Sequence, residues 1–325
     1  MKFQDLKNSL KERVYSSYLL YGVDEFLLLS AYNLIHKYSG IEFEDLNLIK
    51  FTEGIIDGDS VVRACDTMPV FSNRKLVYLD LRMSRKTEIK NIEAIASYLA
   101  QPNQQTVLVI NIGDNDEVLS IDKKLFVEVD CNRLDYKIVA LKIKATISAK
   151  GKTIDDDATK LLFDYSLGDM AKVLLECEKL CGYVGERKEI KKNDIMDIVS
   201  PSLEYQIFEL TEALSKKNSS RVYEILEDMK SKKDEYRTLP AIIYSHFRRL
   251  FMVALNKNMS NFELAKMLSV KEYAIKMTAN QVKLFTVSKL KKINELCIKM
   301  DSDLKQSNIS IDNAINLLVL QILNM

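Results

Sequence analysis

The chain has 325 residues, 47% of them hydrophobic, and its 47 Lys and Arg against 46 Asp and Glu leave a formal net charge of +1. This length predicts two or three domains with hydrophobic cores, and only nine glycines and four prolines exclude collagen-like and low-complexity disordered chains. The near-neutral charge excludes a protein that holds nucleic acid by bulk basicity alone. The N-terminus has no apolar signal-peptide core, no apolar stretch is long enough to span a membrane, and the five cysteines are scattered. We therefore expect a soluble cytoplasmic protein.

The first third of the chain alternates between predicted strands and helices. Short, continuously apolar segments predict strands buried on both faces, at 17–21, 47–51, 75–81, 106–112 and 125–129. Helical spacing of apolar residues between them predicts helices at 24–38, 59–66 and 88–99. This alternation predicts an α/β domain over residues 1–140, with a parallel sheet and helices on its faces.

The rest of the chain is predicted to be helical. Helices at 155–165, 169–181 and 193–199 form a small domain over 141–202, and the first two are joined at Ser166-Leu167-Gly168. Pro201 predicts a hinge at the end of this domain, because it keeps the preceding residue out of the helical region. Amphipathic segments then predict an all-α domain over 203–325, with helices at 219–232, 239–255, 290–304 and 311–323.

An α/β domain followed by a small helical domain is the layout of many nucleotide-driven ATPases, but the sequence lacks their phosphate loop. The junction 21–25, between the first strand and the first long helix, is short, has one glycine and no lysine, and carries Asp24 and Glu25. Those carboxylates would repel phosphates. Gly151-Lys152-Thr153 lacks the glycine needed five positions earlier and is interpreted as a solvated turn. The strand 75–81 carries one carboxylate, Asp80, where a magnesium-binding Asp-Glu pair would end it, and we expect Asp80 at the surface.

Other catalytic and metal-binding patterns are weak. His36 and His246 are far apart, and each is expected as a core or surface histidine. Cys177 and Cys181 are one helical turn apart without further ligands nearby, which favours core packing over a metal site. The acidic run 155–157 precedes an apolar helix, where negative charge favours the helix dipole. We therefore expect no catalytic, nucleotide or metal site and no cofactor.

One connecting segment has an unusual composition. Residues 65–75 join a short helix to a strand, and Pro69 ends the helix. Met68, Val70 and Phe71 place apolar side chains in this loop, although loops are usually polar. The residues alone leave two interpretations open: the side chains are tucked under the domain, or they contact a partner.

The same segments resemble a known family. In order, the chain reads SYLLYGVDEFLL, ACDTMPVFSNRKLVYLDL, QQTVLVINI, AKGKTIDDDATKLLFDYSLGDMAKVLLECEKL and SPSLEYQIFEL. This set resembles the delta subunits of the bacterial DNA polymerase III clamp loader, from about residue 15 to the end. The resemblance implies an AAA+-type fold: a RecA-like α/β domain, a small helical lid and a C-terminal helical collar. It also implies a position for the arginine by which ATP-hydrolysing relatives sense the nucleotide, and here that position is Ala171.

The resemblance implies a function in DNA replication. Family members bind the beta sliding clamp, hold its ring open for loading onto primed DNA, and assemble with delta-prime and gamma/tau subunits in the cytosol, at the nucleoid. They do not hydrolyse ATP, and another subunit of the DNA polymerase III holoenzyme carries its nucleotidyltransferase activity. By position, Val70 and Phe71 match the family's clamp-contacting pair, with Met68 beside them. The resemblance thus favours a loop that contacts a partner.

Alternatives and a DNA contact remain open. The chain could be a delta-prime-like or other non-hydrolysing subunit of an AAA+ complex, although it lacks the zinc-binding cysteines and the Ser-Arg-Cys motif usual in delta-prime. An ATPase and a scaffold of an unrelated complex are further alternatives. Basic residues that could contact the DNA backbone weakly are Lys142, Lys144, Lys150, Lys152, Arg248 and Arg249. A solvated face is the other interpretation of these residues.

Overall fold

The computed structural model describes residues 1–115, 118, 120–231, 236–268, 270, 272–306 and 308–325. The chain forms two compact units, and each is described by itself below. The first contains Met1–Phe163 and Gly168–Lys192, and the second contains Asp164–Leu167 and Asn193–Met325. No helix among the described residues is both long enough and apolar enough to cross a membrane.

The first unit is built on a parallel five-stranded sheet. Its strands are β1 (Ser17–Tyr21), β2 (Leu48–Phe51), β4 (Lys75–Asp80), β6 (Thr106–Gly113) and β7 (Val127–Asp130), arranged in the order β2-β4-β6-β1-β7. All neighbouring pairs are parallel, with Lys75 of β4 opposite Thr106 of β6 and Tyr18 of β1 opposite Val109. All five strands lie where the sequence predicts them, because their near-continuous hydrophobicity suits strands covered on both faces.

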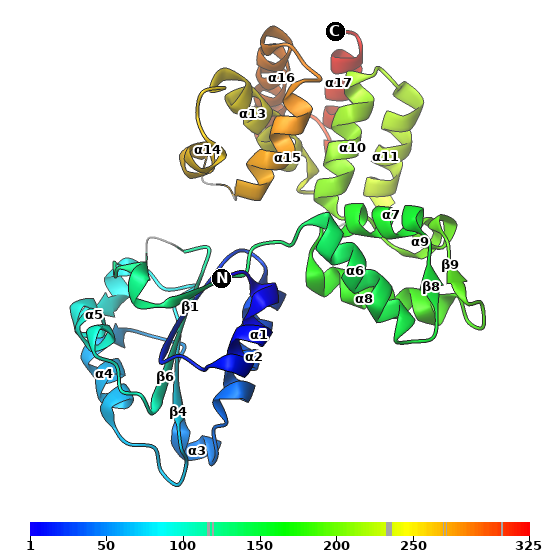
Figure 1. Ribbon diagram of the computed structural model, residues 1–325. Coiled ribbons are helices and arrows are strands. Elements are labelled where there is room, and N and C mark those ends of the chain that lie inside the picture. The colour runs from blue at the N-terminus through cyan, green and yellow to red at the C-terminus, as the bar shows by residue number, and fades with distance from the viewer. Residues whose placement is uncertain (116–117, 119, 232–235, 269, 271, 307) are drawn as a thin grey trace. The chain divides into compact units, whose positions relative to one another are not determined.

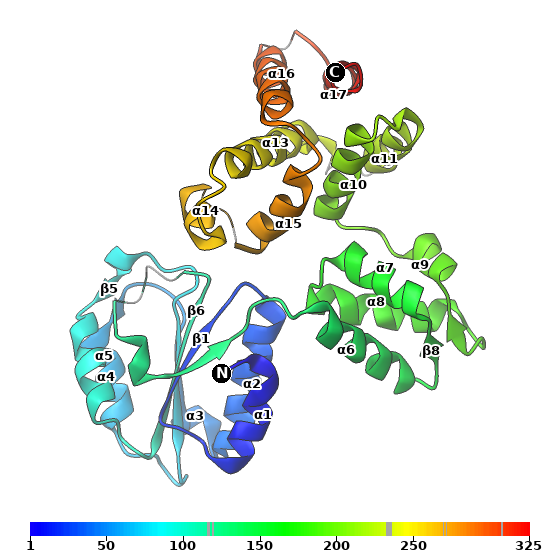
Figure 2. The same ribbon diagram turned by 45° about the horizontal axis from the view of Figure 1, so that its top comes forward.

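Helices cover both faces of the sheet (Figures 1 and 2). Helices α1 (Phe3–Glu12) and α2 (Glu25–Ser39) lie on one face, and α4 (Gly58–Asp66) and α5 (Ile92–Ala100) lie on the other. Alternate strand residues such as Leu19, Val77 and Leu108 pack with α4 and α5 in one buried cluster. Shorter elements complete the domain: α3 (Glu44–Asn47), β3 (Ile56–Asp57), η1 (Lys86–Glu88), β5 (Ile89–Lys90) and η2 (Lys123–Leu125).

The segment after the sheet is mostly helical. It contains α6 (Tyr136–Ser148), β8 (Thr153–Ile154), α7 (Asp156–Ser166), α8 (Met170–Tyr183), β9 (Glu189–Ile190) and α9 (Lys192–Ile198). The predicted junction between α7 and α8 is confirmed, since Leu167 and Gly168 both have left-handed φ angles, which end α7. The sequence did not predict α1, α6 or the short parallel pair β8–β9.

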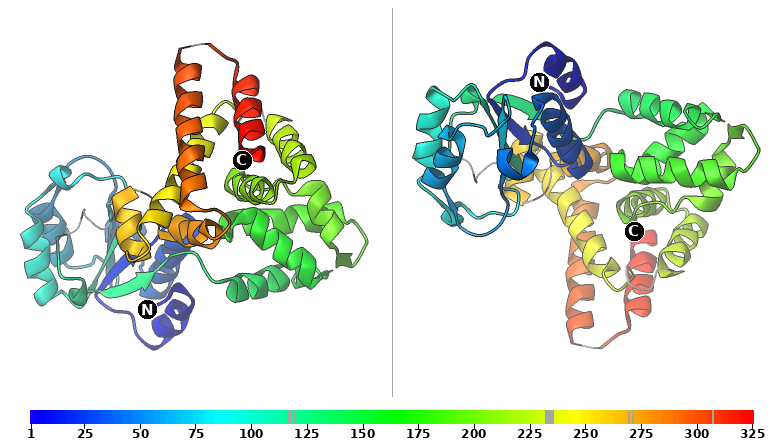
Figure 3. Two further views of the ribbon diagram at one scale, coloured as in Figure 1. Left: turned by 90° about the horizontal axis from the view of Figure 1, so that it is seen from above. Right: turned by 90° about the horizontal axis from the view of Figure 1, so that it is seen from below.

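The second unit is helical apart from its connections, as the sequence predicts. Its described helices after α9 are α10 (Leu203–Ser215), α11 (Ser219–Ser231), α13 (Leu239–Leu255), α14 (Asn261–Leu268), α15 (Glu272–Val282), α16 (Val287–Lys305) and α17 (Ile311–Leu323). Its main core contains the predicted apolar stripes of α16 and α17. These two helices run side by side in opposite directions (Figure 3). The predicted helix 219–232 extends to Lys232, which lies outside the described residues.

Candidate functional site

The carboxyl ends of β1, β4 and β6 meet at one edge of the sheet, where open α/β domains usually bind ligands. Here the turn between β1 and α2 is packed directly against its neighbours. Gly22 has a φ of +133°, and a Cβ built on it would lie 2.3 Å from the carbonyl carbon of Cys131. Its N–H donates to Gly113 O at 2.7 Å, and Asp24 N–H donates to Cys131 O at 3.2 Å. Backbone atoms therefore fill the space beside this turn.

Asp24 places a buried carboxylate at the starts of two helices. Its Oδ1 accepts a hydrogen bond from Leu27 N in α2 at 3.0 Å, and its Oδ2 accepts one from Met170 N in α8 at 3.5 Å. Burial raises the pKa of Asp24, and these two hydrogen bonds oppose the increase. A carboxylate here offsets the positive ends of the helix dipoles. It would also repel a bound phosphate.

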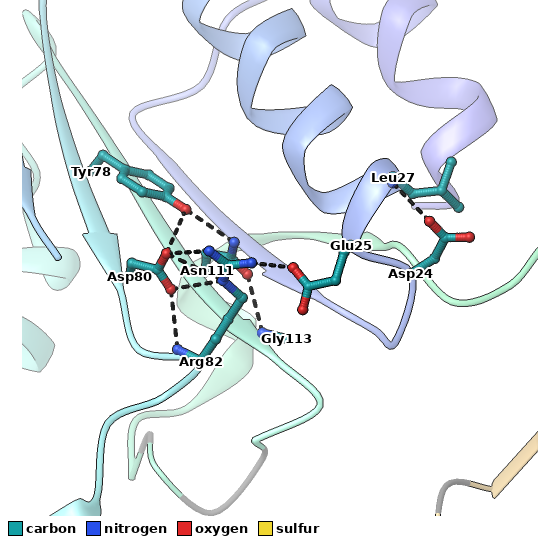
Figure 4. Close-up of polar contacts among 8 residues, drawn as sticks. All are labelled: Asp24, Glu25, Leu27, Tyr78, Asp80, Arg82, Asn111 and Gly113. Carbon is teal, nitrogen blue, oxygen red and sulfur yellow. Dashed lines mark hydrogen bonds and ion pairs between the residues drawn. The ribbon is translucent and has the colours of Figure 1, made fainter. Parts of the chain in front are cut away.

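The Arg82 side chain lies at this edge between Asp80 and Glu25 (Figure 4). Its guanidinium hydrogen-bonds both carboxylate oxygens of Asp80, with Nε to Oδ1 at 2.9 Å, and also contacts Glu25. Burial would raise the pKa of Asp80, but the hydrogen bonds from Arg82 outweigh it and lower this pKa below its usual value. We name Asp24, Glu25, Tyr78, Asp80, Arg82 and Asn111 the carboxyl-edge cluster.

The structure differs from the sequence expectation at Asp80. The sequence predicts a surface residue, whereas the Asp80 side chain is only 15% exposed. Arg82 covers it, and Tyr78 donates a hydrogen bond to it from Oη at 3.4 Å. Buried Asn111 donates in turn to Tyr78 at 3.0 Å and accepts from Gly113 N at 3.1 Å. Polar groups of this edge are thus satisfied by the chain itself.

The amino end of β4 differs from its carboxyl end, because its apolar side chains are exposed. We call residues 67–74, between α4 and β4, the α4–β4 loop. Its three apolar residues are exposed, Met68 by 67%, Val70 by 41% and Phe71 by 82%. The interpretation in which Phe71 is tucked under the domain is therefore wrong. Clustered exposed apolar side chains are typical of an interaction surface.

The backbone of this loop is held by hydrogen bonds. Asn47, at the end of α3, is fully buried. Its Oδ1 accepts from Val70 N at 2.8 Å, and its Nδ2 donates to Val70 O at 2.8 Å. Ser72 Oγ accepts from Glu42 N at 3.2 Å, and Lys75 Nζ donates to Thr67 Oγ1 at 2.5 Å. The apolar side chains are therefore exposed on a fixed backbone.

Phe71 itself has a strained backbone. Its φ is +52°, in the left-handed region that bulky side chains rarely adopt. Such conformations cost on the order of 1 kcal/mol and are found where the surrounding structure enforces them, often at functional sites. The ring of Phe71 lies edge-to-face against Phe43, with centroids 6.2 Å apart.

Four of the six basic residues predicted as weak DNA contacts make contacts within their own units. Lys144 pairs with Asp156 at 2.5 Å and Lys150 with Glu178 at 3.6 Å. Lys152 Nζ donates to the carbonyl oxygens of Gly185 and Arg187, so Gly151-Lys152-Thr153 forms a structural turn. Lys142, Lys144, Lys150 and Arg248 are exposed, whereas Arg249 is partly buried and lies 3.2 Å from His246 Nδ1.

The surroundings of the two histidines and of Cys177 and Cys181 favour structural roles for these residues. His36 stacks on Tyr32, with ring centroids 6.0 Å apart. His246 is buried, and burial together with Arg249 lowers its pKa to about 3. Cys177 and Cys181 are buried free thiols, as expected for core packing. Among the described residues, no group of three or more His, Cys, Asp or Glu side chains is placed to hold a metal ion.

Sequence reasoning missed Phe43, Asn47 and Arg82. The one available signal was Phe43 in the polar context Glu42-Phe43-Glu44, an apolar residue in a connection like those of the α4–β4 loop. Asn47 was predicted to begin a strand, and its contact with Val70 spans distant parts of the chain. Arg82 gave no signal, because an arginine after a strand is common.

Two family models match the chain. The DNA polymerase III delta subunit model matches residues 18–131, and the model of the delta subunit's C-terminal domain matches residues 204–322. A DNA polymerase III subunit delta from Bacillus subtilis is 25% identical over 337 residues, covering 99% of this chain and 97% of the relative. The solved structure of a Bacillus subtilis DNA clamp loader delta protein matches with a TM-score of 0.73 and 25% identity, covering 99% of this chain and 100% of that chain.

Proposed function

The chain belongs to the family of DNA polymerase III delta subunits, and from this premise we propose that it binds the beta sliding clamp through the α4–β4 loop and holds the ring open. The fold is AAA+-like, with a parallel five-stranded sheet domain followed by helical domains. Within the proposal, residues 1–140 bind the clamp, 141–202 form the lid, and 203–325 form the collar that joins the subunits.

The observation that carries this proposal is the exposure of Phe71 on a fixed, strained backbone. Burying a phenylalanine side chain in a partner's pocket contributes about 1.5–3 kcal/mol, the range of an interface hot spot. Because Asn47 and Ser72 already hold the loop, little ordering entropy is lost on binding. Phe71 is the principal anchor, and Met68 contributes beside it. Val70 contributes less, because its side chain is smaller and less exposed.

The mechanism is thermodynamic. A subunit that binds the opened ring more tightly than the closed ring shifts the clamp towards the open state by that difference in affinity. Sister gamma/tau and delta-prime subunits supply the ATP-driven control, exposing this surface before loading and covering it after hydrolysis on primed DNA. The carboxyl-edge cluster supports a subunit that does not use ATP itself, since Asp24 and Arg82 occupy the edge where a nucleotide would bind.

Direct contact with DNA has a minor part in the proposal. Lys142 and Arg248 are exposed and could approach the phosphate backbone in the assembled loader. The contacts of Lys144, Lys150 and Lys152 within their own unit favour a structural role for these three. The protein acts in the bacterial cytosol at the nucleoid, as part of the DNA polymerase III holoenzyme, and carries no polymerase activity of its own.

A binding titration tests the proposal. The purified chain is titrated against the same organism's sliding clamp without ATP, in parallel with Phe71→Ala and Met83→Ala. Met83 is a highly exposed apolar residue beyond the other end of β4, so it is the matched control. We expect binding without nucleotide, weakened by Phe71→Ala by about 2 kcal/mol, or thirtyfold, and unchanged by Met83→Ala.

Circular dichroism of each variant separates binding from folding. A folded Phe71→Ala variant with reduced affinity supports the proposal. Wild-type protein that is folded and does not bind the clamp contradicts it, and moves the delta-prime-like and scaffold alternatives ahead.

A further inference from the structure

Phe43 lies beside Phe71 and has the same unusual features. Its side chain is 61% exposed, its φ is +51°, and its ring contacts the Phe71 ring edge-to-face at 6.2 Å. Phe43 immediately precedes α3, whereas Phe71 lies in the α4–β4 loop, so two separate segments bring their exposed rings together. Two neighbouring exposed phenylalanines with left-handed backbones form one continuous aromatic surface.

One buried side chain connects the two segments. The Nδ2 of Asn47 donates to Glu42 O at 2.7 Å, next to Phe43, and to Val70 O at 2.8 Å, next to Phe71. Its Oδ1 accepts from Val70 N at 2.8 Å. The hydrogen bond from Glu42 N to Ser72 Oγ connects the segments again on the far side of Phe71. The amide of Asn47 therefore fixes the backbone beside both rings.

We infer that Phe43 is a second aromatic contact with the sliding clamp and that Asn47 is a positioning residue that presents Phe43 and Phe71 as one preformed surface. The inference rests on the proposed clamp binding. It requires an apolar depression on the clamp that takes both rings rather than a pocket for Phe71 alone. Preformation matters because rings that are already held in place lose less conformational entropy on binding.

The first test measures clamp affinity for Phe43→Ala, with Phe262→Ala as the matched control. Phe262 lies on α14 in the second unit and is also 61% exposed, so both substitutions remove an equally exposed ring. We expect Phe43→Ala to weaken binding about tenfold and Phe262→Ala to leave it unchanged. Wild-type affinity in Phe43→Ala would overturn the role of Phe43.

A double-mutant cycle sharpens this test. Because the two rings touch, the losses in Phe43→Ala and Phe71→Ala should not add, and the double variant should lose less than the product of the two fold-changes. Simple multiplication of the two losses would indicate separate contacts and contradict the single surface.

The positioning role of Asn47 is tested by Asn47→Asp and Asn47→Ala. The aspartate keeps an acceptor for Val70 N, but it loses the hydrogen bonds donated to the carbonyl oxygens of Glu42, Phe43 and Val70 and sets a carboxyl group against them. Both variants should therefore bind the clamp more weakly than wild type. Hydrogen exchange at the Val70 amide supplies a readout besides affinity. We expect slow exchange in wild type relative to the exposed neighbour Asn73, and about tenfold faster exchange in Asn47→Ala.

Different experimental results would contradict the proposed function and the positioning role of Asn47. If the wild-type protein does not bind the clamp, the proposed function fails. If it binds but folded Asn47 variants retain wild-type affinity, the positioning role fails. If both Asn47 variants unfold, exchange in the wild type decides, and a Val70 amide exchanging as fast as that of Asn73 overturns the inference.

Discussion

At one end of strand β4 the side chains have partners within the chain, and at the other end apolar side chains are exposed to solvent. At its carboxyl end, Asp80 is held by Arg82 and Tyr78, in a cluster that bonds within the chain (Figure 4). At its amino end, the backbone of the α4–β4 loop is bonded, but Phe71 and Met68 remain exposed. Unpaired buried polar groups are costly, so the carboxyl end is closed by internal partners. Exposed apolar side chains on an ordered backbone can gain by binding, so the amino end is suited to a partner.

The largest expected effect is at the turn that closes the carboxyl edge. Gly22→Ala places a Cβ 2.3 Å from backbone carbon at a φ of +133°. We expect a loss of about 3–5 kcal/mol in the free energy of unfolding, measured by chemical denaturation. The control is Gly54→Ala, where φ is +77° but nothing lies within 4 Å of the added atom, and the loss should be about 1 kcal/mol. Equal losses in the two variants would contradict the close packing of this turn.

The second-largest expected effect is the loss of stability when Arg82 is replaced. Arg82→Ala leaves the mostly buried Asp80 carboxylate without its cation, and we expect a loss of about 2 kcal/mol in the free energy of unfolding. Calorimetry measures this loss, and Lys86→Ala, in the exposed segment that follows, is the control. Gain of nucleotide binding by Arg82→Ala would show that Arg82 alone blocks the edge. We expect none, because Asp24 and Asp80 remain.

The pH dependence of stability tests the same ion pair. The pKa of Asp80 is lowered in the folded protein, so its contribution is present above the unfolded value near 3.8 and is lost as the pH falls through the lower folded pKa. In Arg82→Ala burial dominates, so the pKa should rise above 3.8 and the contribution should change sign. Between wild type and Arg82→Ala, we expect the contribution of Asp80 to the free energy of unfolding to differ by about 1–2 kcal/mol. Carbon NMR titration of the Asp80 carboxyl group measures the pKa in each protein, and thermal unfolding at several pH values measures the stability. An unchanged Asp80 pKa in Arg82→Ala would contradict the assigned cause.

The smallest effect isolates the backbone of the α4–β4 loop. Phe71→Gly and Phe71→Ala both remove the exposed ring, but only glycine adopts a φ of +52° without strain. We expect Phe71→Gly to be about 1 kcal/mol more stable than Phe71→Ala in denaturant titrations. Both should bind the clamp poorly. A more stable alanine variant would mean that the left-handed conformation is not maintained without the ring.

Local sequence patterns predicted the main elements of the fold. The apolar runs that form β1 and β6 and the periodic stripes that form α13 and α17 lie within a residue of their predicted bounds. The predicted helix 88–99 instead begins at Ile92, because Ile89–Lys90 pairs with Ile56–Asp57 as β5 and β3. The predicted elements do not include helix α6, although its buried residues Val139, Ile143 and Ile147 repeat every four residues.

Sequence by itself determined the elements, the missing phosphate loop, and the placement of Met68, Val70 and Phe71 in a loop, because these features depend on neighbouring residues. Tertiary structure decided that Phe71 is exposed, that Phe43 lies beside it, and that Asn47 holds both segments. It also decided that Arg82 covers Asp80 and reaches Glu25, on a different element. Hydrogen bonds and ring contacts between distant segments depend on directions that a linear pattern does not encode, so they exist only once the sheet and its helices have packed.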